Sequence, residues 1–156
     1  MRRKIYTNTV KLLGKTHSNV TVAASNLANT LILMGEDLDP KSIASVREGQ
    51  KILAEALPLS LRVNGADHEI THALQTQYAM SFCLLNELKA LDDDESRDDI
   101  EKGLATMENV YRRSRQILGE AHPQTMRSQY VLKILQQKVE MIRSGEHREY
   151  CNLPVV

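Results

Sequence analysis

The 156-residue chain is poor in aromatic residues, with no tryptophan, one phenylalanine and five tyrosines. Proteins that bind single-stranded nucleic acid stack its bases on aromatic side chains, so this composition disfavours that class. Neither positive nor negative charge is in excess, because the 20 Lys and Arg residues match the 20 Asp and Glu residues. A net charge of zero gives no general attraction to nucleic acid or to an anionic membrane. We expect no nucleic-acid partner, although the basic clusters at 2–4 and 112–115 leave a nucleic-acid-binding helical repeat as an alternative.

Cysteine and long apolar runs are also scarce. Cys83 lies in an apolar stretch, as a packed thiol does, and the second cysteine, Cys151, has no comparable context. Two unmatched cysteines suit a reducing compartment. No apolar stretch follows the basic residues at 2–4, as it would in a secretory signal, and no run approaches the ~20 residues that cross a bilayer. We expect a cytoplasmic protein without a membrane partner.

Catalytic motifs are largely missing: the chain has no phosphate-binding loop, no Gly-x-Ser-x-Gly and no Cys-x-x-Cys. The acidic run at 92–99 lacks the glycine and the spacing of a calcium loop. One string, His68-Glu69-Ile70-Thr71-His72, matches the zinc-protease pattern His-Glu-x-x-His, which needs both histidines on one helical face. Here His68 falls in an expected turn, and no third histidine follows closely. We therefore expect no enzyme, metal or cofactor, with a zinc-dependent hydrolase at His68, Glu69 and His72 as an alternative.

A Gly-x-x-His motif occurs three times, at 14–17, 65–68 and 119–122. Apolar residues precede each copy and a helical pattern follows it. The glycines are spaced at nearly equal intervals of 51 residues (from 14 to 65) and 54 residues (from 65 to 119). Regular spacing with helical sequence between the copies is typical of stacked helical repeats. The motif is interpreted as the turn between two helices, in which the histidine caps or packs the turn.

Apolar residues recur every three or four positions between these turns, which predicts helices. Pro58 is expected to kink or interrupt the third of them, because proline lacks an amide donor. The tail at 144–156 is expected to be flexible. The predicted helices span residues 2–13, 19–34, 39–63, 69–89, 97–118 and 123–143.

Further residues match a known repeat family. The segment from Ile117 to Thr125, Ile-Leu-Gly-Glu-Ala-His-Pro-Gln-Thr, resembles the inter-repeat turn of kinesin-light-chain-type tetratricopeptide repeats. The strings at 26–28 (Asn-Leu-Ala) and 77–79 (Gln-Tyr-Ala) stand where the first helix of that repeat, helix A, carries Asn-Leu-Ala. Gly49 and Gly103 both lie 16 residues before the next motif glycine, where the second helix, helix B, has a small residue that helix A crosses closely. The first two turns lack the proline of the third, and the repeats are longer than those of the family.

The resemblance implies an all-α, right-handed solenoid of stacked antiparallel helix hairpins over residues 1–143. The order of helices, from a helix B to a helix A, suits part of a larger repeat array or complex. It also implies a non-catalytic scaffold that binds a peptide or partner protein through the concave helix A surface, where side-chain amides can pair with a peptide backbone. The lysine-rich carboxylate clamp of chaperone-binding members is not reproduced. The residues that the register places on the concave surface, and that we predict as the binding site, are Ser25, Asn26, Asn29, Thr76, Gln77, Arg127 and Tyr130.

Overall fold

The computed structural model describes residues 1–34, 42–88 and 94–144, and these residues form helices and turns without a strand. The all-helical prediction is confirmed. The helices are α1 (Arg2–Leu13), α2 (Ser18–Leu33), α3 (Ile43–Val63), α4 (Glu69–Leu88), α5 (Asp94–Leu118) and α6 (Pro123–Ser144). Helix α5 begins three residues earlier than predicted and includes most of the acidic run at 92–99. The start of that run, Cys151 and the predicted tail from residue 145 onward lie outside the described residues.

Pro58 does not interrupt α3, which continues from Ile43 to Val63. A proline leaves the carbonyl four residues earlier without its amide donor. Both Pro58 and Ala54, which carries that carbonyl, lie on the exposed side of the helix, where water can hydrogen-bond to it. Buried residues on both sides of the proline, Leu53 and Ser60, hold the two halves of the helix in the core.

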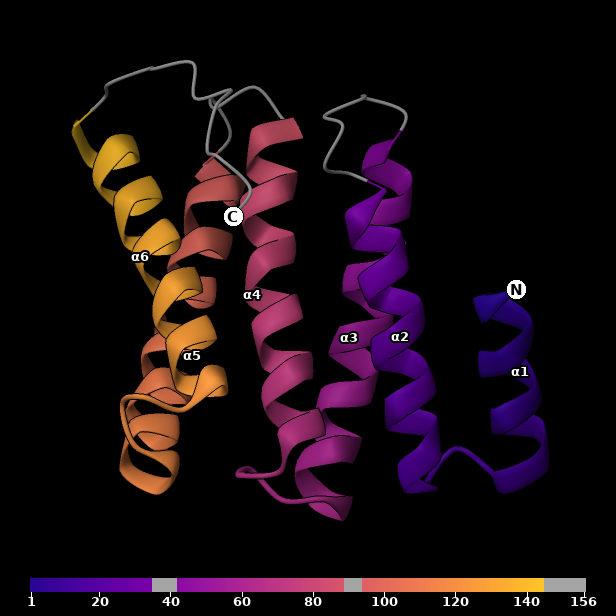
Figure 1. Ribbon diagram of the computed structural model, residues 1–156. Coiled ribbons are helices and arrows are strands. Elements are labelled where there is room, and N and C mark those ends of the chain that lie inside the picture. The colour runs from indigo at the N-terminus through magenta and orange to yellow at the C-terminus, as the bar shows by residue number, and fades with distance from the viewer. Residues whose placement is uncertain (35–41, 89–93, 145–156) are drawn as a thin grey trace.

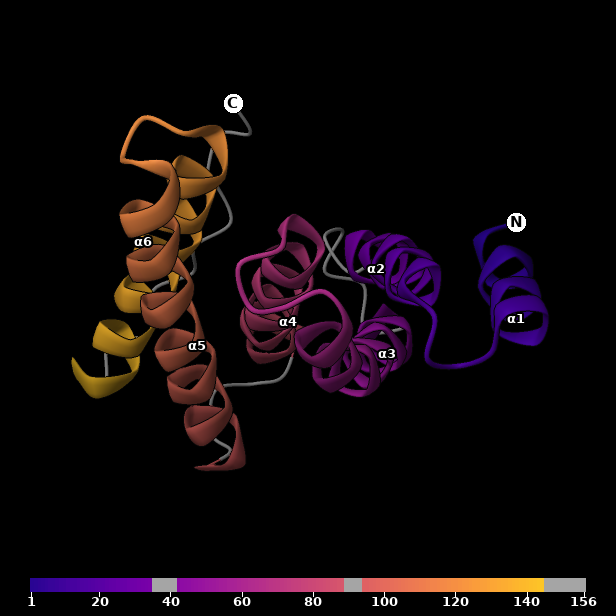
Figure 2. The same ribbon diagram turned by 90° about the horizontal axis from the view of Figure 1, so that it is seen from below.

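The helices stand side by side in a row that begins with α1 and ends with α5 and α6 (Figure 1, and from below in Figure 2). Each helix packs on its neighbour in the sequence, and in addition α2 packs on α4 and α4 on α6. The three Gly-x-x-His turns that follow α1, α3 and α5, here called hinges, all lie along the same edge of the row, at the bottom of Figure 1. Successive even-numbered helices can therefore contribute side chains to one shared surface.

The core consists of two apolar clusters that meet at α4. The first joins α2, α3 and α4, and the second joins α4, α5 and α6. Tyr78 and Phe82 of α4 meet edge to face with ring centroids 4.8 Å apart. Polar groups also pair within the packed region, since the hydroxyls of Ser60 and Thr71 lie 2.8 Å apart. Helices α3 and α5 thus each share one core with the even-numbered helices beside them. None of the described helices is long and apolar enough to cross a membrane.

Two glycines mark equivalent close crossings in the two clusters. A Cβ at Gly49 would lie 3.1 Å from the carbonyl oxygen of Ala28, and a Cβ at Gly103 would lie 3.5 Å from that of Ala79. Ala28 and Ala79 each stand eleven residues after a motif histidine. The close approach predicted for both glycines is confirmed, and it places α2 on α3 in the same register as α4 on α5.

Candidate partner-binding groove

The three Gly-x-x-His motifs form the hinges between odd and even helices. Each glycine has a positive φ: 77° at Gly14, 87° at Gly65 and 84° at Gly119. L-residues with a side chain rarely adopt such values, and glycine does so without steric cost. The glycine therefore lets the chain leave one helix and enter the next within a few residues.

The histidine of each motif caps the helix that follows. Nδ1 of His17 accepts a hydrogen bond from the backbone N–H of Asn19 at 3.1 Å. Nδ1 of His68 and of His122 likewise accepts from the amide two residues further on, at 3.2 Å in both. The first amides of a helix have no partner within it, so each ring satisfies one of them. The predicted capping role of the three histidines is confirmed.

This capping bears on the zinc-protease string at 68–72. His68 is exposed and its Nδ1 accepts from Ile70, whereas His72 is buried inside the protein. Within the described parts of the chain, no three His, Cys, Asp or Glu side chains are placed to hold a metal ion together. The zinc-hydrolase alternative gains no support from this arrangement.

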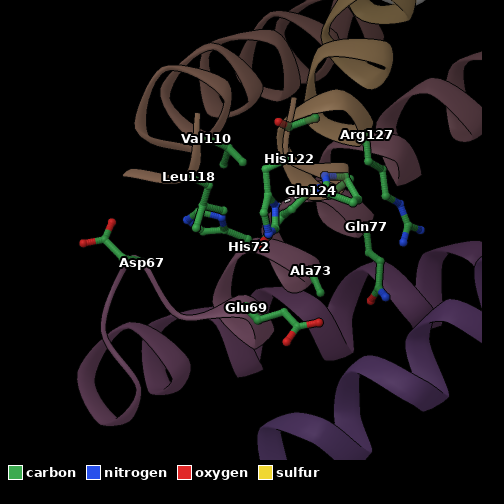
Figure 3. A pocket seen from close by; sticks show the side chains of 13 residues that line it. Asp67, Glu69, His72, Ala73, Gln77, Val110, Leu118, His122, Gln124 and Arg127 are labelled. Carbon is green, nitrogen blue, oxygen red and sulfur yellow. Dashed lines mark hydrogen bonds between the residues drawn. The ribbon is translucent and has the colours of Figure 1, made fainter. Parts of the chain in front are cut away.

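A groove of about 600 Å³ lies between the first halves of α4 and α6, and the last turns of α5 close one side of it (Figure 3). Its α4 wall is a single helical face, because each lining residue of α4 has another one three or four positions away. The lining residues of α4 are Glu69, His72, Ala73, Thr76 and Gln77, and those of α6 include Pro123, Gln124, Arg127 and Ser128.

Three of the predicted binding residues, Thr76, Gln77 and Arg127, meet in this groove. The hydroxyl of Ser25 donates to Oε1 of Gln77 at 3.2 Å, so α2 holds the Gln77 amide in a fixed orientation. Arg127 is exposed and pairs with no acidic side chain among the described residues. The groove thus presents an oriented amide on α4 and an available guanidinium on α6.

Two carboxylates lie toward the other side of the groove (Figure 3). That of Asp67 is already used, since it forms an ion pair with Arg113 of α5 at 2.7 Å. Glu69 is exposed in the first turn of α4, where the partial positive charge of the helix end favours a carboxylate. Within the described structure, Glu69 has no cationic partner. The groove therefore carries one available charge of each sign, on different helices.

His72 forms the buried base of this side of the groove. Only 2% of the residue is exposed, and Nδ1 lies 3.1 Å from the hydroxyl of Ser114. No hydrogen bond from a described residue reaches its Nε2. Burial lowers the pKa of His72 and Arg113 lowers it further, whereas Asp67 and the carbonyl of Ala66 act in the opposite direction. Burial thus favours the neutral form of the ring, which links α4 to α5 through Ser114.

The remaining predicted residues do not gather in the groove. Ser25 is buried on α2 and reaches the groove only through Gln77. Asn26 is exposed on α2, outside the groove lining, and its backbone carbonyl accepts a hydrogen bond from Arg2 at 3.0 Å. Asn29 is half-buried, and Tyr130 is 56% exposed on α6 outside the lining. The structure thus concentrates the candidate site on α4 and α6.

The sequence prediction missed several lining residues, including Glu69, His72, Gln124 and Ser128. A signal for the first two was present, because counting back from Thr76 and Gln77 in steps of three and four leads to them. His72 was considered only as a metal ligand, and its burial depends on α5, which no local pattern specifies.

Comparison with protein-family models, with curated proteins and with solved structures gave no match to this chain.

Proposed function

We propose that this chain is a tetratricopeptide-like repeat module that binds an extended peptide segment of a partner protein in the groove between α4 and α6. One observation carries the proposal: Thr76, Gln77 and Arg127, expected on a shared surface from the repeat register, line a single groove formed by two successive even helices.

The repeated contacts support the solenoid part of the proposal. The same features recur at equivalent positions: a hinge glycine, a histidine cap and a close crossing of two helices. In addition, each even-numbered helix packs on the next one. Units of this kind bury their apolar faces by stacking, which creates an extended surface suited to partner binding. In this scheme α2, α4 and α6 are helices A, and α1, α3 and α5 are helices B of a right-handed stack.

The groove chemistry favours a peptide over a small apolar ligand. Because Oε1 of Gln77 already accepts from Ser25, the N–H groups of its amide are the part left to donate to a peptide carbonyl. Arg127 offers a guanidinium that can form paired hydrogen bonds with a carboxylate. We therefore expect the bound peptide to carry an acidic side chain beside Arg127, and a basic side chain opposite Glu69 would add to its orientation.

The other functions have less support. A zinc hydrolase would need the rings of His68 and His72 to face one ion, whereas the exposed His68 ring caps α4 and the buried His72 ring lies against Ser114. A nucleic-acid surface would need a continuous basic stripe, whereas this groove combines Arg127 with the carboxylates of Asp67 and Glu69.

Peptide selection tests the proposal. The purified chain would be used to select binders from a library of random peptides, and the dissociation constants of selected peptides would be measured by fluorescence anisotropy. We expect acidic residues to be enriched. Arg127→Ala is expected to weaken binding about tenfold, the effect of losing about 1.4 kcal/mol from a charge-assisted hydrogen bond.

A matched control is Lys133→Ala, which removes an exposed cation of α6 outside the groove lining. This variant should bind selected peptides as the unaltered chain does. The proposal is wrong if no peptide is selected, or if Arg127→Ala and Gln77→Ala both leave binding unchanged while circular dichroism shows intact helices.

A further inference from the structure

Helix α1 occupies the position of a helix B whose own helix A is not among the described helices. Among the described helices it packs mainly on α2, which follows it. By contrast, α3 packs on α2 and α4, and α5 packs on α4 and α6. Helix α1 accordingly has no buried residue, while α3 buries residues along its length.

The hinge register identifies the uncovered side of α1. Ile5, Ala56 and Val110 each lie nine residues before a hinge glycine. Ala56 is 7% exposed and belongs to a cluster with Ala24 and Ala28 of α2. Val110 is 2% exposed in the equivalent cluster of α4 and α5, yet Ile5 is 53% exposed.

A second large apolar side chain extends this uncovered side. Leu12 lies seven residues, or two helical turns, after Ile5 and is 82% exposed. Apolar residues seven apart lie along one face of a helix, which is the pattern that packs against another helix. The other two odd-numbered helices are each covered by the helix before them, since α2 packs on α3 and α4 packs on α5. The occupant that fits this face is therefore a helix.

The charge of α1 indicates what kind of helix would bind to its exposed face. Its sequence contains four cations, Arg2, Arg3, Lys4 and Lys11, and no acidic residue. Arg3 is paired with Glu48, and Arg2 donates to Asn26 and Thr30 of α2. Lys4 and Lys11 are exposed, and within the described structure neither is in an ion pair. These two lysines, on a helix without an acidic residue, favour an acidic partner.

We propose that the exposed face of α1, defined by Ile5 and Leu12 and bordered by Lys4 and Lys11, binds an acidic amphipathic helix of a partner protein. The partner helix takes the place on α1 that α2 takes on α3. Its apolar residues, spaced at i, i+3, i+4 and i+7, cover Ile5 and Leu12, and its carboxylates pair with the two lysines. This inference rests on the hinge register and on the charge of α1, and it does not depend on peptide binding in the α4–α6 groove.

The probe for this surface is a synthetic helical peptide with leucines at i, i+3, i+4 and i+7 and glutamates at most other positions. Its binding to the full chain would be measured by fluorescence anisotropy at low and high salt. The control probe has the same leucines with lysines in place of the glutamates. We expect the glutamate peptide to bind, the lysine peptide to bind at least about tenfold more weakly, and added salt to weaken the interaction.

The double variant Ile5→Ser/Leu12→Ser should weaken binding of the glutamate peptide at least about tenfold, because it removes both apolar contacts. Met126→Ser is the matched control, since Met126 is 57% exposed and belongs to α6, at the opposite end of the row of helices from α1 (Figure 1). Both changes affect exposed side chains, and circular dichroism would verify that the helices persist. Arg127→Ala should leave binding of the glutamate helix unchanged, which separates this test from that of the groove.

Several outcomes would overturn the inference. The proposal that α1 binds an acidic helix is wrong if the glutamate peptide does not bind, or if the double variant binds it as tightly as the unaltered chain does. Concentration-dependent self-association that is lost in the double variant would assign the face to a second copy of the chain instead. Binding to vesicles of anionic phospholipid that requires Ile5 and Leu12, without binding of the glutamate peptide, would assign it to a membrane surface.

Discussion

Gly49 of α3 lies directly against the backbone of Ala28 on α2, and a Cβ at residue 49 would lie only 3.1 Å from the Ala28 carbonyl oxygen. Side-chain atoms of Leu31 and Ile32 would lie 3.2 Å away. The oxygen belongs to a packed helix and cannot move without shifting α2. This contact fixes how closely α2 and α3 approach one another.

The equivalent crossing at Gly103 is less restricted. The nearest atoms to a Cβ there would be Cδ2 of Phe82 at 3.3 Å and Cδ2 of Leu135 at 3.4 Å, both at the ends of side chains. Replacing a helical glycine with alanine gains about 1 kcal/mol of helix propensity. Overpacking, which costs about 1–3 kcal/mol, is expected to offset that gain at residue 49 more than at residue 103.

We therefore predict that Gly49→Ala lowers the free energy of unfolding relative to Gly103→Ala by about 1 kcal/mol or more. Urea unfolding followed by circular dichroism measures the difference. Equal stability of the two variants would show that α2 shifts freely at this crossing.

The histidine caps make a second prediction. His68→Ala removes the acceptor for the amide of Ile70 and should destabilise the chain by about 1 kcal/mol, as loss of an N-cap does. His68→Ser supplies another acceptor at the same position and should retain most of the stability. Thermal unfolding of the two variants compares them, and a serine variant as unstable as the alanine variant would contradict the capping role.

The buried His72 predicts a dependence of stability on pH. Burial lowers its pKa in the folded chain below the ordinary value of 6.5, so the unfolded chain binds the proton more readily. The free energy of unfolding should therefore decrease as the pH falls below the ordinary pKa, and the decrease should end once the pH passes the lowered pKa of the folded state. Above the ordinary pKa, His72 is neutral in both states and contributes no pH dependence.

His72→Gln removes this titration while keeping a side chain that can hydrogen-bond to Ser114. Urea unfolding at about pH 7 and about pH 5 should show a smaller loss of stability for the variant than for the unaltered chain. If both proteins lose the same stability over this range, the pH dependence arises from other groups.

Local signals in the sequence were enough to locate the helices to within a few residues. Gly14, Gly65 and Gly119 end one helix, and the histidine three residues later caps the next, so both effects act within one helical turn. Gly49 and Gly103 likewise marked close crossings, because only a small side chain tolerates them. Pro58 was the exception, since solvent exposure of the affected carbonyl allows α3 to continue.

The candidate site depended on contacts between helices that are distant in the sequence. The register placed Ser25 and Gln77 on related faces, but only packing of α2 on α4 buries Ser25 and orients the Gln77 amide. His72 is buried because Ser114 of α5 lies beside it, and Arg127 reaches the groove because α6 packs on α4.

The sequence by itself determined where the helices lie to within a few residues and which positions are equivalent relative to the three motif glycines, because caps, hinges and apolar periodicity act over a few residues. Only the tertiary structure decided which of the equivalent side chains are buried, paired or available. That outcome depends on the neighbouring helix: Ala56 and Val110 are covered by one, whereas Ile5, at the same distance from its hinge glycine, is exposed.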